Sequence, residues 1–341
     1  MSRPLETAPS GSTFLAGSGS GSVATVLPIR VGISSCLLGE EVRYDGGHQK
    51  DPYITGVLAR HFTWVPVCPE LEVGMGVPRE PIRLVGDPAA PRLLGVTSGA
   101  DHTTRMNEFA RRRAQELGRR GLSGYVLKRA SPSCGMERVK LYPDDDGPPA
   151  RAGVGLFARA LMDALPLLPV EEEGRLNDAR RRDNFITRVF AYRRLTALRE
   201  MPPRPGDVVA FHTAHEYLLL AHHPGAYARL GRRVAGITAA PLAEWLEGYA
   251  EAFMRALQAP ATPRKHLNVL QHIVGFFKRR LAAAEKRELA GVIDDYARGL
   301  VPLIVPITLI NHHVARFDAA YVRDQIYLHP HPKELMLRNH V

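Results

Sequence analysis

The chain has 341 residues, of which 45% are hydrophobic and 23% are charged. This length exceeds one typical domain and predicts two, each long enough to bury a core of its own. The formal net charge of +10 is divided unevenly, because residues 1–170 carry 20 basic against 17 acidic side chains and residues 171–341 carry 25 against 18. A basic second half points to a polyanionic partner such as nucleic acid, although a solvated surface in an arginine-rich proteome gives the same count.

The composition argues against a secreted or membrane-embedded protein. Residues 1–21 lack the continuous apolar core of a signal peptide. The longest apolar stretch, 300–310, contains Pro302 and Pro306, and it is too short and too broken to span a bilayer. Three widely spaced cysteines do not form a disulfide framework. We therefore expect a cytoplasmic protein without membrane contact.

The first half alternates between short apolar runs and helical patterns. Residues 1–27 are rich in Gly, Ser and Thr without periodicity, and we expect a disordered leader there. From 28 to 165 the alternation predicts an α/β fold with a mostly parallel, Rossmann-like sheet. The expected strands are 29–33, 62–67, 81–86, 92–96 and 125–127, and the expected helices lie near 52–60, at 101–117 and beyond 153.

The pattern changes in the second half. Residues 166–175 contain two prolines and a run of three glutamates, and we expect a linker. From 176 to 336 apolar residues recur with a period near 3.6, and prolines separate the segments. An all-α second domain is therefore expected.

Each of the three cysteines, Cys36, Cys68 and Cys134, follows a candidate strand. Loops beyond the carboxyl ends of parallel strands converge on one crevice, so the three thiols are expected to meet. They could be small buried hydrophobes, or ligands of a structural zinc site completed by His48, although the close cysteine pairs usual in such sites are missing. The third possibility is an iron–sulfur cluster on three thiolates, which leaves one iron open to a soft donor such as sulfur.

Three ordered stretches resemble the signatures of the thiouracil desulfidase (TudS) family over about residues 28–165. They are 34–39 (SSCLLG), 67–70 (VCPE) and 131–135 (SPSCG). Residues 176–336 resemble the helical YbgA-type domain, with matching stretches at 215–217, 268–272, 275–277, 305–309 and 325–332. Two-domain proteins of this type are associated with removing sulfur from 4-thiouridine in tRNA.

The resemblance implies a role for each signature residue. Cys36, Cys68 and Cys134 would bind a 4Fe–4S cluster with one open iron, Glu70 would be the acid/base residue, and Ser131 would position the substrate or a proton. The implied reaction is a non-redox, hydrolytic desulfidation in which the open iron polarises the thiocarbonyl and Glu70 activates water. Without the resemblance, the glutamate would as readily cap a turn and the serine would shape one.

A tRNA substrate would need basic side chains along its backbone. The candidates are Lys128 and Arg129 beside the catalytic loop, the runs Arg180, Arg181, Arg182 and Lys278, Arg279, Arg280, and the intervening Arg188, Arg193 and Arg194. A free thiolated base or nucleoside is the alternative substrate. The alternative function is a non-catalytic cluster or zinc protein that binds RNA or senses redox state.

The second half also contains four histidines close together, at positions 212, 215, 222 and 223. His215-Glu216 does not continue into a zinc-binding His-Glu-x-x-His motif, because position 219 is a leucine. We expect packed or capping histidines. Protein partners cannot be read from this sequence.

Overall fold

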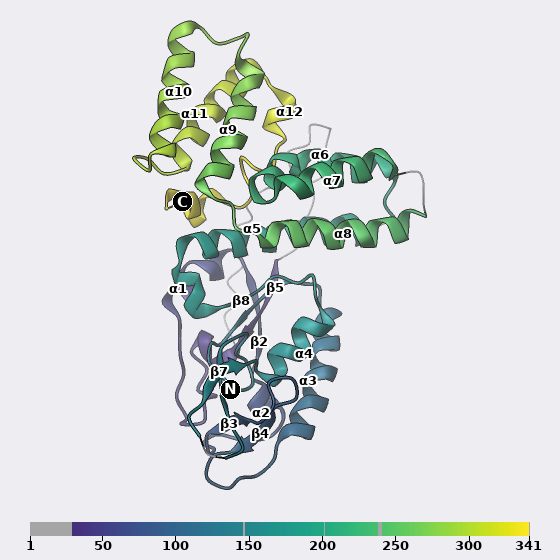
Figure 1. The fold of residues 1–341 in the computed structure, drawn as a ribbon, viewed down its shortest axis with the longest axis vertical. Helices are drawn as coiled ribbons and strands as arrows, with labels where there is room; N and C mark the ends of the chain where they lie inside the picture. The colour runs from purple at the N-terminus through teal and green to yellow at the C-terminus, as the bar shows by residue number, and fades with distance from the viewer. Residues whose placement is uncertain (1–28, 146, 201, 238–240, 341) are drawn as a thin grey trace, which may run out of the picture.

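The computed structural model describes residues 29–145, 147–200, 202–237 and 241–340. The expected leader, residues 1–27, lies outside this part of the chain. The described residues form an elongated molecule with an α/β part at one end and a helical part at the other (Figure 1). The expectation of an α/β region followed by an all-α region is confirmed.

Sheet A is parallel and has the strand order β2-β1-β5-β8. Its strands are β1 (Arg30–Ser34), β2 (Thr63–Val67), β5 (Leu122–Leu127) and β8 (Val170–Glu172). All residues of the central strand β5 are buried, as expected for a strand covered on both faces. The chain passes from β1 to β2 on one side and later returns to β5 on the other. The carboxyl ends of β1 and β5 therefore form a topological switch point, the usual ligand position in such sheets.

Sheet B is a separate, mixed sheet with the order β4-β3-β6-β7. It contains β3 (Ile82–Val85), β4 (Arg92–Gly95), β6 (Val139–Tyr142) and β7 (Ala150–Gly153). The hairpin β3–β4 was expected from the sequence, whereas the parallel pairing of β3 with β6 was not. Figure 1 places β3 and β4 at the end of the molecule away from the helical part.

Short helices follow the first two strands of sheet A, and longer ones cover its faces. The short elements are η1 (Ser35–Leu38), α1 (Pro52–Gly56), η2 (Leu58–Arg60) and α2 (Pro69–Glu72). The helix α3 (Thr103–Gly118) packs along α4 (Leu156–Ala164). The buried residues of α3 include Met106, Phe109 and Leu117, so its apolar stripe faces the sheets.

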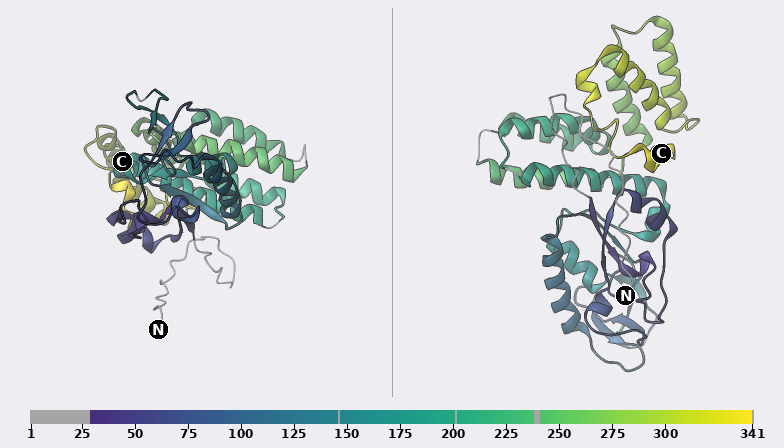
Figure 2. Two further views of the ribbon diagram at one scale, coloured as in Figure 1. Left: turned by 90° about the horizontal axis from the view of Figure 1, so that it is seen from below. Right: turned by 180° about the vertical axis from the view of Figure 1, so that it is seen from behind.

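The helical part begins with α5 (Ala179–Glu200), after the short helix η3 (Glu173–Asn177). Figure 2 shows the helical part from behind as two groups of helices. The helices α5 to α8 form a layer next to the α/β part, and α9 to α12 form a second group on the far side of that layer. These elements are α6 (Pro205–His222), α7 (Pro224–Ala235), α8 (Leu242–Gln258), α9 (Pro263–Phe277), α10 (Ala283–Ala297), α11 (Ile304–Phe317) and α12 (Ala320–Arg323), followed by η5 (Lys333–Leu335) and η6 (Leu337–Asn339). None of the described helices combines the length and the apolar character that a membrane crossing needs.

The two parts share a core through α5. Phe185 and Val189 of this helix belong to the same buried cluster as Val31 of β1, and Leu335 near the chain's end joins them. A Cβ added at Gly124 of β5 would lie 2.7 Å from Val189 Cγ2, so the glycine allows α5 to lie directly on the sheet. The helical part thus packs directly on sheet A through α5, and the two are not joined by a flexible connection alone.

Residues 166–175 are not the linker that we expected, because they include β8, the edge strand of sheet A. This strand pairs with β5 in the register Tyr125 to Val170. The glutamates at 171, 172 and 173 are buried. Each has partners: Glu171 pairs with Arg175 Nε at 2.6 Å, Glu172 accepts the N–H of Met136 at 2.8 Å, and Glu173 binds the segment after β5. A run of carboxylates usually marks a solvated segment, and only these partners make its burial possible.

Candidate active site

A cavity of about 400 Å³ opens at the carboxyl ends of β1, β2 and β5, at the switch point of sheet A. Its lining includes all three cysteines, together with Glu70 and Ser131. The structure therefore brings together every residue to which the family resemblance assigned a catalytic or cluster-binding role. The strand order explains this meeting, since each cysteine directly follows a strand of the same parallel sheet.

The three thiols lie close enough to influence one another. Burial raises the pKa of Cys36 to about 11, with smaller contributions from Cys68 and Glu173, while Lys128 opposes the rise. Burial also raises the pKa of Cys134, where a hydrogen bond from Ser34 opposes the rise and the other two cysteines reinforce it. Such thiols ionise only if a cation takes the place of their protons, which is the condition that a metal centre meets.

The donor set fits a cluster better than a single zinc ion. Among the described residues, no three His, Cys, Asp or Glu side chains converge closely enough to hold one metal ion. The ligands of one zinc lie about 2.3 Å from it, so their sulfur atoms lie within roughly 4 Å of one another. A cubane cluster instead binds each thiolate through a different iron and accepts more widely spaced sulfur atoms. His48, the fourth ligand considered for zinc, is exposed, and its Nδ1 accepts the N–H of Lys50 at 3.2 Å.

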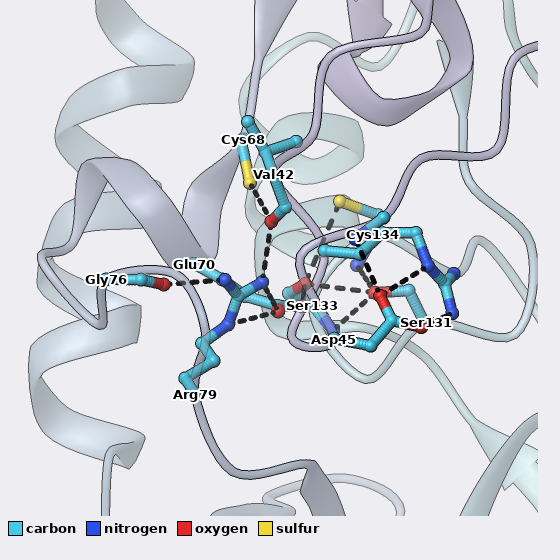
Figure 3. A network of polar contacts seen from close by, with 11 residues as sticks. Val42, Asp45, Cys68, Glu70, Gly76, Arg79, Ser131, Ser133 and Cys134 are labelled. Atoms are coloured by element: carbon cyan, nitrogen blue, oxygen red, sulfur yellow. Dashed lines mark hydrogen bonds and ion pairs between the residues drawn. The ribbon is translucent and has the colours of Figure 1, made fainter.

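Glu70 lies in α2, two residues after Cys68, and both of its carboxylate oxygens are hydrogen-bonded (Figure 3). Ser133 Oγ donates to Oε1 at 2.5 Å. Arg79 Nε donates to Oε2 at 3.1 Å, and Arg79 Nη2 pairs with the same oxygen. The side chains of Arg79 and Glu70 are only 6% and 14% exposed, so solvent screens this ion pair little.

Arg79 was not singled out from the sequence, yet it joins three loops of the site. Its Nη1 donates to the carbonyl of Gly76 at 2.8 Å, and its Nη2 donates to the carbonyl of Val42 at 3.0 Å. The Val42 carbonyl also lies 3.8 Å from Cys68 Sγ (Figure 3). The signal available from the sequence was indirect, because a carboxylate in an apolar crevice requires a nearby cation.

Ser131 organises the cysteine loop, and Ser133 contacts Glu70. Ser131 Oγ accepts the N–H groups of Ser133 and Cys134 at 3.3 and 3.1 Å. The two serine hydroxyls are 3.0 Å apart. Because the Ser133 proton is directed to Glu70, Ser131 must donate to Ser133. The result is a hydroxyl chain from Ser131 through Ser133 to Glu70, of which the sequence prediction named only the two ends.

Two glycines allow this loop to close tightly. A Cβ at Gly135 would lie 2.4 Å from Val139 Cγ2, and one at Gly155 would lie 2.5 Å from the carbonyl carbon of Ser133. Any larger residue would displace the backbone that carries Cys134.

Lys128 and Arg129, expected beside the catalytic loop, both line the cavity. Lys128 Nζ pairs with Glu173 at 2.6 Å, and the same carboxylate accepts the N–H of Arg129 at 2.7 Å. Lys128 N–H also donates to Ser34 Oγ at 3.0 Å. Lys128 is therefore engaged in holding the site together, whereas the Arg129 side chain is exposed at the cavity rim.

The remaining basic candidates are dispersed over the helical part. Arg180 and Arg181 are exposed at the start of α5, and Arg182 lies over the ring of Tyr53 at 4.9 Å. The run of Lys278, Arg279 and Arg280 is exposed directly after α9. Arg193 pairs with Glu200.

Arg188 and Arg194 do not fit the phosphate-binding role that we expected. Burial lowers the pKa of both, that of Arg194 to about 10. Arg194 Nη2 donates to the carbonyl of Pro330 at 2.8 Å. These two side chains contribute to the packing of α5 rather than to an exposed cationic surface.

The fold and the site define a class of protein in which an α/β domain with a three-cysteine cavity precedes a helical domain. Residues 31–173 match the family described as 2-thiouracil desulfurase, and residues 216–332 match the family described as a protein of unknown function (DUF1722). The chain therefore belongs to the 2-thiouracil desulfurase family through its first part and to the YbgA-like DUF1722 family through its second.

Each of the similar proteins covers less than half of the chain. The uncharacterized protein YbgA of Escherichia coli (strain K12) is 33% identical over 158 residues, which is 46% of this chain and 94% of that protein. The uncharacterized protein YbbK of Bacillus subtilis (strain 168) is 35% identical over 108 residues, 30% of this chain and 71% of that protein. The solved structure of the [4Fe-4S]-dependent thiouracil desulfidase TudS is 28% identical, covers 44% of this chain and 93% of its own, and gives a TM-score of 0.36.

Proposed function

We propose that this protein is a non-redox, iron–sulfur-dependent desulfidase that removes sulfur from 4-thiouridine in tRNA. The observation that carries the proposal is the single cavity in which three cysteines lie together with Glu70 and its hydrogen-bonded partners. The match to the 2-thiouracil desulfurase family supports a thiolated pyrimidine as the substrate class. The higher positive charge of the second half supports a substrate carried on RNA.

The overall reaction exchanges a C=S bond for a C=O bond. One water molecule is consumed, one molecule of hydrogen sulfide is released, and no net electrons are transferred. Cys36, Cys68 and Cys134 would hold a 4Fe–4S cluster, which when bound supplies an iron without a protein ligand as a Lewis acid for the thiocarbonyl sulfur.

Glu70 is the general base in this proposal. A carboxylate oxygen has two lone pairs, and Arg79 occupies both on Oε2 through its two N–H groups. Ser133 occupies one on Oε1, which leaves the other free to accept a proton from water. The hydroxyl chain from Ser131 through Ser133 donates toward Oε1 and orients this oxygen. The proton that Glu70 takes from water leaves with the released hydrogen sulfide.

The test is an anaerobic reconstitution followed by a tRNA desulfidation assay. The loaded protein should abolish the near-ultraviolet absorbance of 4-thiouridine in tRNA and release sulfide. Glu70→Gln should keep its iron content and lose about 10²-fold or more in turnover. The matched control is Glu116→Gln, an exposed glutamate on α3 that should leave turnover unchanged.

Two outcomes would contradict the proposal in different ways. Activity on free 4-thiouridine or thiouracil, with intact tRNA left unreacted, would replace tRNA by the small substrate. A cluster-loaded protein that releases sulfide from none of these compounds would exclude the desulfidase and leave a binding or sensing protein.

A further inference from the structure

The helical part exposes a stacked pair of aromatic rings far along the chain from the cysteine site. Phe276 in α9 and Tyr321 in α12 lie with ring centroids 5.0 Å apart and an interplanar angle of 19°. Phe276 is 49% exposed and Tyr321 is 37% exposed. Two half-exposed rings in parallel form a flat apolar surface that water solvates poorly.

Contacts with α6 hold Tyr321 in place. Tyr217 of α6 packs edge-on against Tyr321, with centroids 6.1 Å apart. The Tyr321 hydroxyl donates to Glu216 Oε2 at 2.6 Å, which fixes the rotation of the ring. Gln325, just after α12, donates to the carbonyl of Thr213 at 2.8 Å and ties this segment to α6. A ligand that stacks on the pair would therefore lose little side-chain entropy.

A run of positive charge follows Phe276 in the chain, just beyond the end of α9. Lys278, Arg279 and Arg280 follow α9 and are exposed, and within the described part of the chain none of them has a carboxylate partner at ion-pair distance. Arg280 Nη1 donates to the carbonyl of Phe317 at 2.9 Å, at the end of α11. The basic run thus borders the segment that leads to Tyr321.

Two of the acidic groups nearby are paired with a cation, because Asp318 and Asp324 both contact Arg323. Glu216 accepts the Tyr321 hydroxyl and keeps its charge on the α6 side of that ring. The cations available to a ligand at this surface are therefore Lys278 and Arg279. Their charge favours a polyanion over an apolar protein partner or a second copy of the chain.

We propose that Phe276 and Tyr321 form a stacking platform for unpaired nucleotides of an RNA, with Lys278 and Arg279 on the adjacent phosphates. Aromatic side chains stack on bases of any sequence, and neighbouring cations follow the phosphate backbone. The inference rests on the proposed function insofar as the RNA is the substrate of the cysteine site. The binding itself requires no desulfidation.

The experiment measures fluorescence anisotropy of the full chain with two fluorescein-labelled RNAs, a single strand and a hairpin duplex of the same composition. Phe276→Ala and Tyr321→Ala should each weaken binding of the single strand about tenfold, since each removes a ring on which an unpaired base can stack. Neither should affect binding of the duplex much, because its bases are already stacked on one another. Lys278→Ala and Arg279→Ala should each reduce the slope of log affinity against log salt by about 0.7.

Conservative variants separate stacking from folding. Tyr321→Phe keeps the ring and loses only the bond to Glu216, so it should bind the single strand much more tightly than Tyr321→Ala does. Phe276→Leu keeps an apolar side chain but not the flat ring and should bind as Phe276→Ala does. Leu300→Ala removes a side chain that is 64% exposed elsewhere in the helical part and should leave binding unchanged. Melting temperatures of all variants verify that they fold.

The outcomes distinguish this platform from the proposed function. The stacking platform is excluded if Phe276→Ala and Tyr321→Ala both bind the single strand as tightly as the wild type does. It is also excluded if the wild type binds neither RNA. Sedimentation of the wild type as a dimer that these two variants dissociate excludes it as well, because the surface would then join two copies. A protein that binds the single strand through these rings but releases no sulfide from thiolated tRNA supports the platform and contradicts the desulfidase.

Discussion

Glu70 has a different partner on each oxygen, and this asymmetry determines which oxygen can act. Arg79 holds Oε2 through two N–H groups, whereas Oε1 has a single donor, Ser133. Arg79 on one oxygen orients the carboxylate, while the single hydroxyl on the other leaves a lone pair that can accept a further proton. Arg79 is thus a positioning residue for the general base.

Replacing Arg79 should therefore reduce turnover without removing the cysteine site. We expect Arg79→Met to lower kcat about 10- to 100-fold, the usual effect of removing a group that orients a functional side chain. Arg79→Lys should recover only part of this loss, because an ammonium cannot also reach the carbonyls of Val42 and Gly76. The measurement is kcat alongside iron content. Full activity in Arg79→Met at normal iron content would show that Glu70 needs no such support.

Alanine substitutions of the two serines of the cysteine loop should affect iron content and kcat differently. Ser131→Ala leaves the N–H groups of Ser133 and Cys134 without their acceptor, which costs about 1–3 kcal/mol and should lower the iron content of the purified protein. Ser133→Ala removes the donor to Glu70 and a 3.8 Å contact with Cys134 Sγ, but it leaves the N–H groups of the loop bonded to Ser131. It should therefore keep most of the iron while lowering kcat. Equal losses of iron in both variants would contradict this division of roles.

At the scale of elements, Glu173, which directly follows β8, links the edge of sheet A to the site. This glutamate accepts both the Lys128 ammonium and the Arg129 N–H, and the side chains of the pair are 15% and 11% exposed. Without the carboxylate, Lys128 would be left partly buried beside Cys36 with no counter-charge. The edge strand thereby fixes the segment that runs from β5 into the cysteine loop.

Glu173→Ala should accordingly destabilise the α/β part by about 2 kcal/mol, below the full cost of a completely buried pair. A matched control is Glu200→Ala, which breaks the ion pair with Arg193 at a glutamate that is 53% exposed and should cost less than about 0.5 kcal/mol. Urea unfolding followed by circular dichroism measures both. Similar midpoints for Glu173→Ala and Glu200→Ala would show that β8 holds the loop without this ion pair.

The same elements show what the sequence could and could not predict. The meeting of Cys36, Cys68 and Cys134 was predictable, because one rule about parallel strands places all three on one edge of sheet A. The helical half was predictable from its 3.6-residue period. Arg79 was not, since its role arises from a loop that folds back onto α2. Ser133 resembled a turn residue, and its contact with Glu70 joins a loop and a helix that are 63 residues apart in the sequence.

Burial of charge explains the remaining errors. Residues 171–173 resembled a linker because three adjacent carboxylates normally face water, and their partners come from other elements. Arg188 and Arg194 resembled a phosphate-binding stripe, because sequence alone does not show which side chains of α5 become buried. In both cases tertiary contacts, rather than local pattern, decided the environment.

At the scale of the whole molecule, α5 contributes buried residues to the cores of both parts. Its Phe185 and Val189 complete the core beneath Val31. A chain cut before α5 would expose this apolar face of sheet A, so we expect residues 29–177 alone to aggregate or to melt well below the full chain. Thermal unfolding of both forms tests this expectation. Equal melting temperatures would show that the sheet does not depend on α5.

The helical part contains histidines that are neutral because they are buried, as the packed or capping role expected from the sequence requires. Burial lowers the pKa of His215 to about 3, with Arg194 acting in the same direction. It lowers the pKa of His222 to about 4 and that of His266 to about 3. His215 and His222 bond to the carbonyls of Phe211 and Ala259, and His266 bonds to the Tyr327 hydroxyl.

These three pKa values make the stability of the helical part sensitive to acid. Below a pH of about 6.5 the unfolded chain binds protons that the folded chain excludes, so stability falls as the pH falls from 6.5 toward the folded pKa values. Each histidine contributes about 1.4 kcal/mol per pH unit, or about 4 kcal/mol for all three at pH 5.5.

The melting temperature should therefore drop between pH 7.5 and pH 5.5, and His266→Phe should flatten that drop, whereas substitution of the exposed His48 by glutamine should not. A pH-independent melting temperature, or an unaltered drop in His266→Phe, would mean that these rings are protonated in the folded protein.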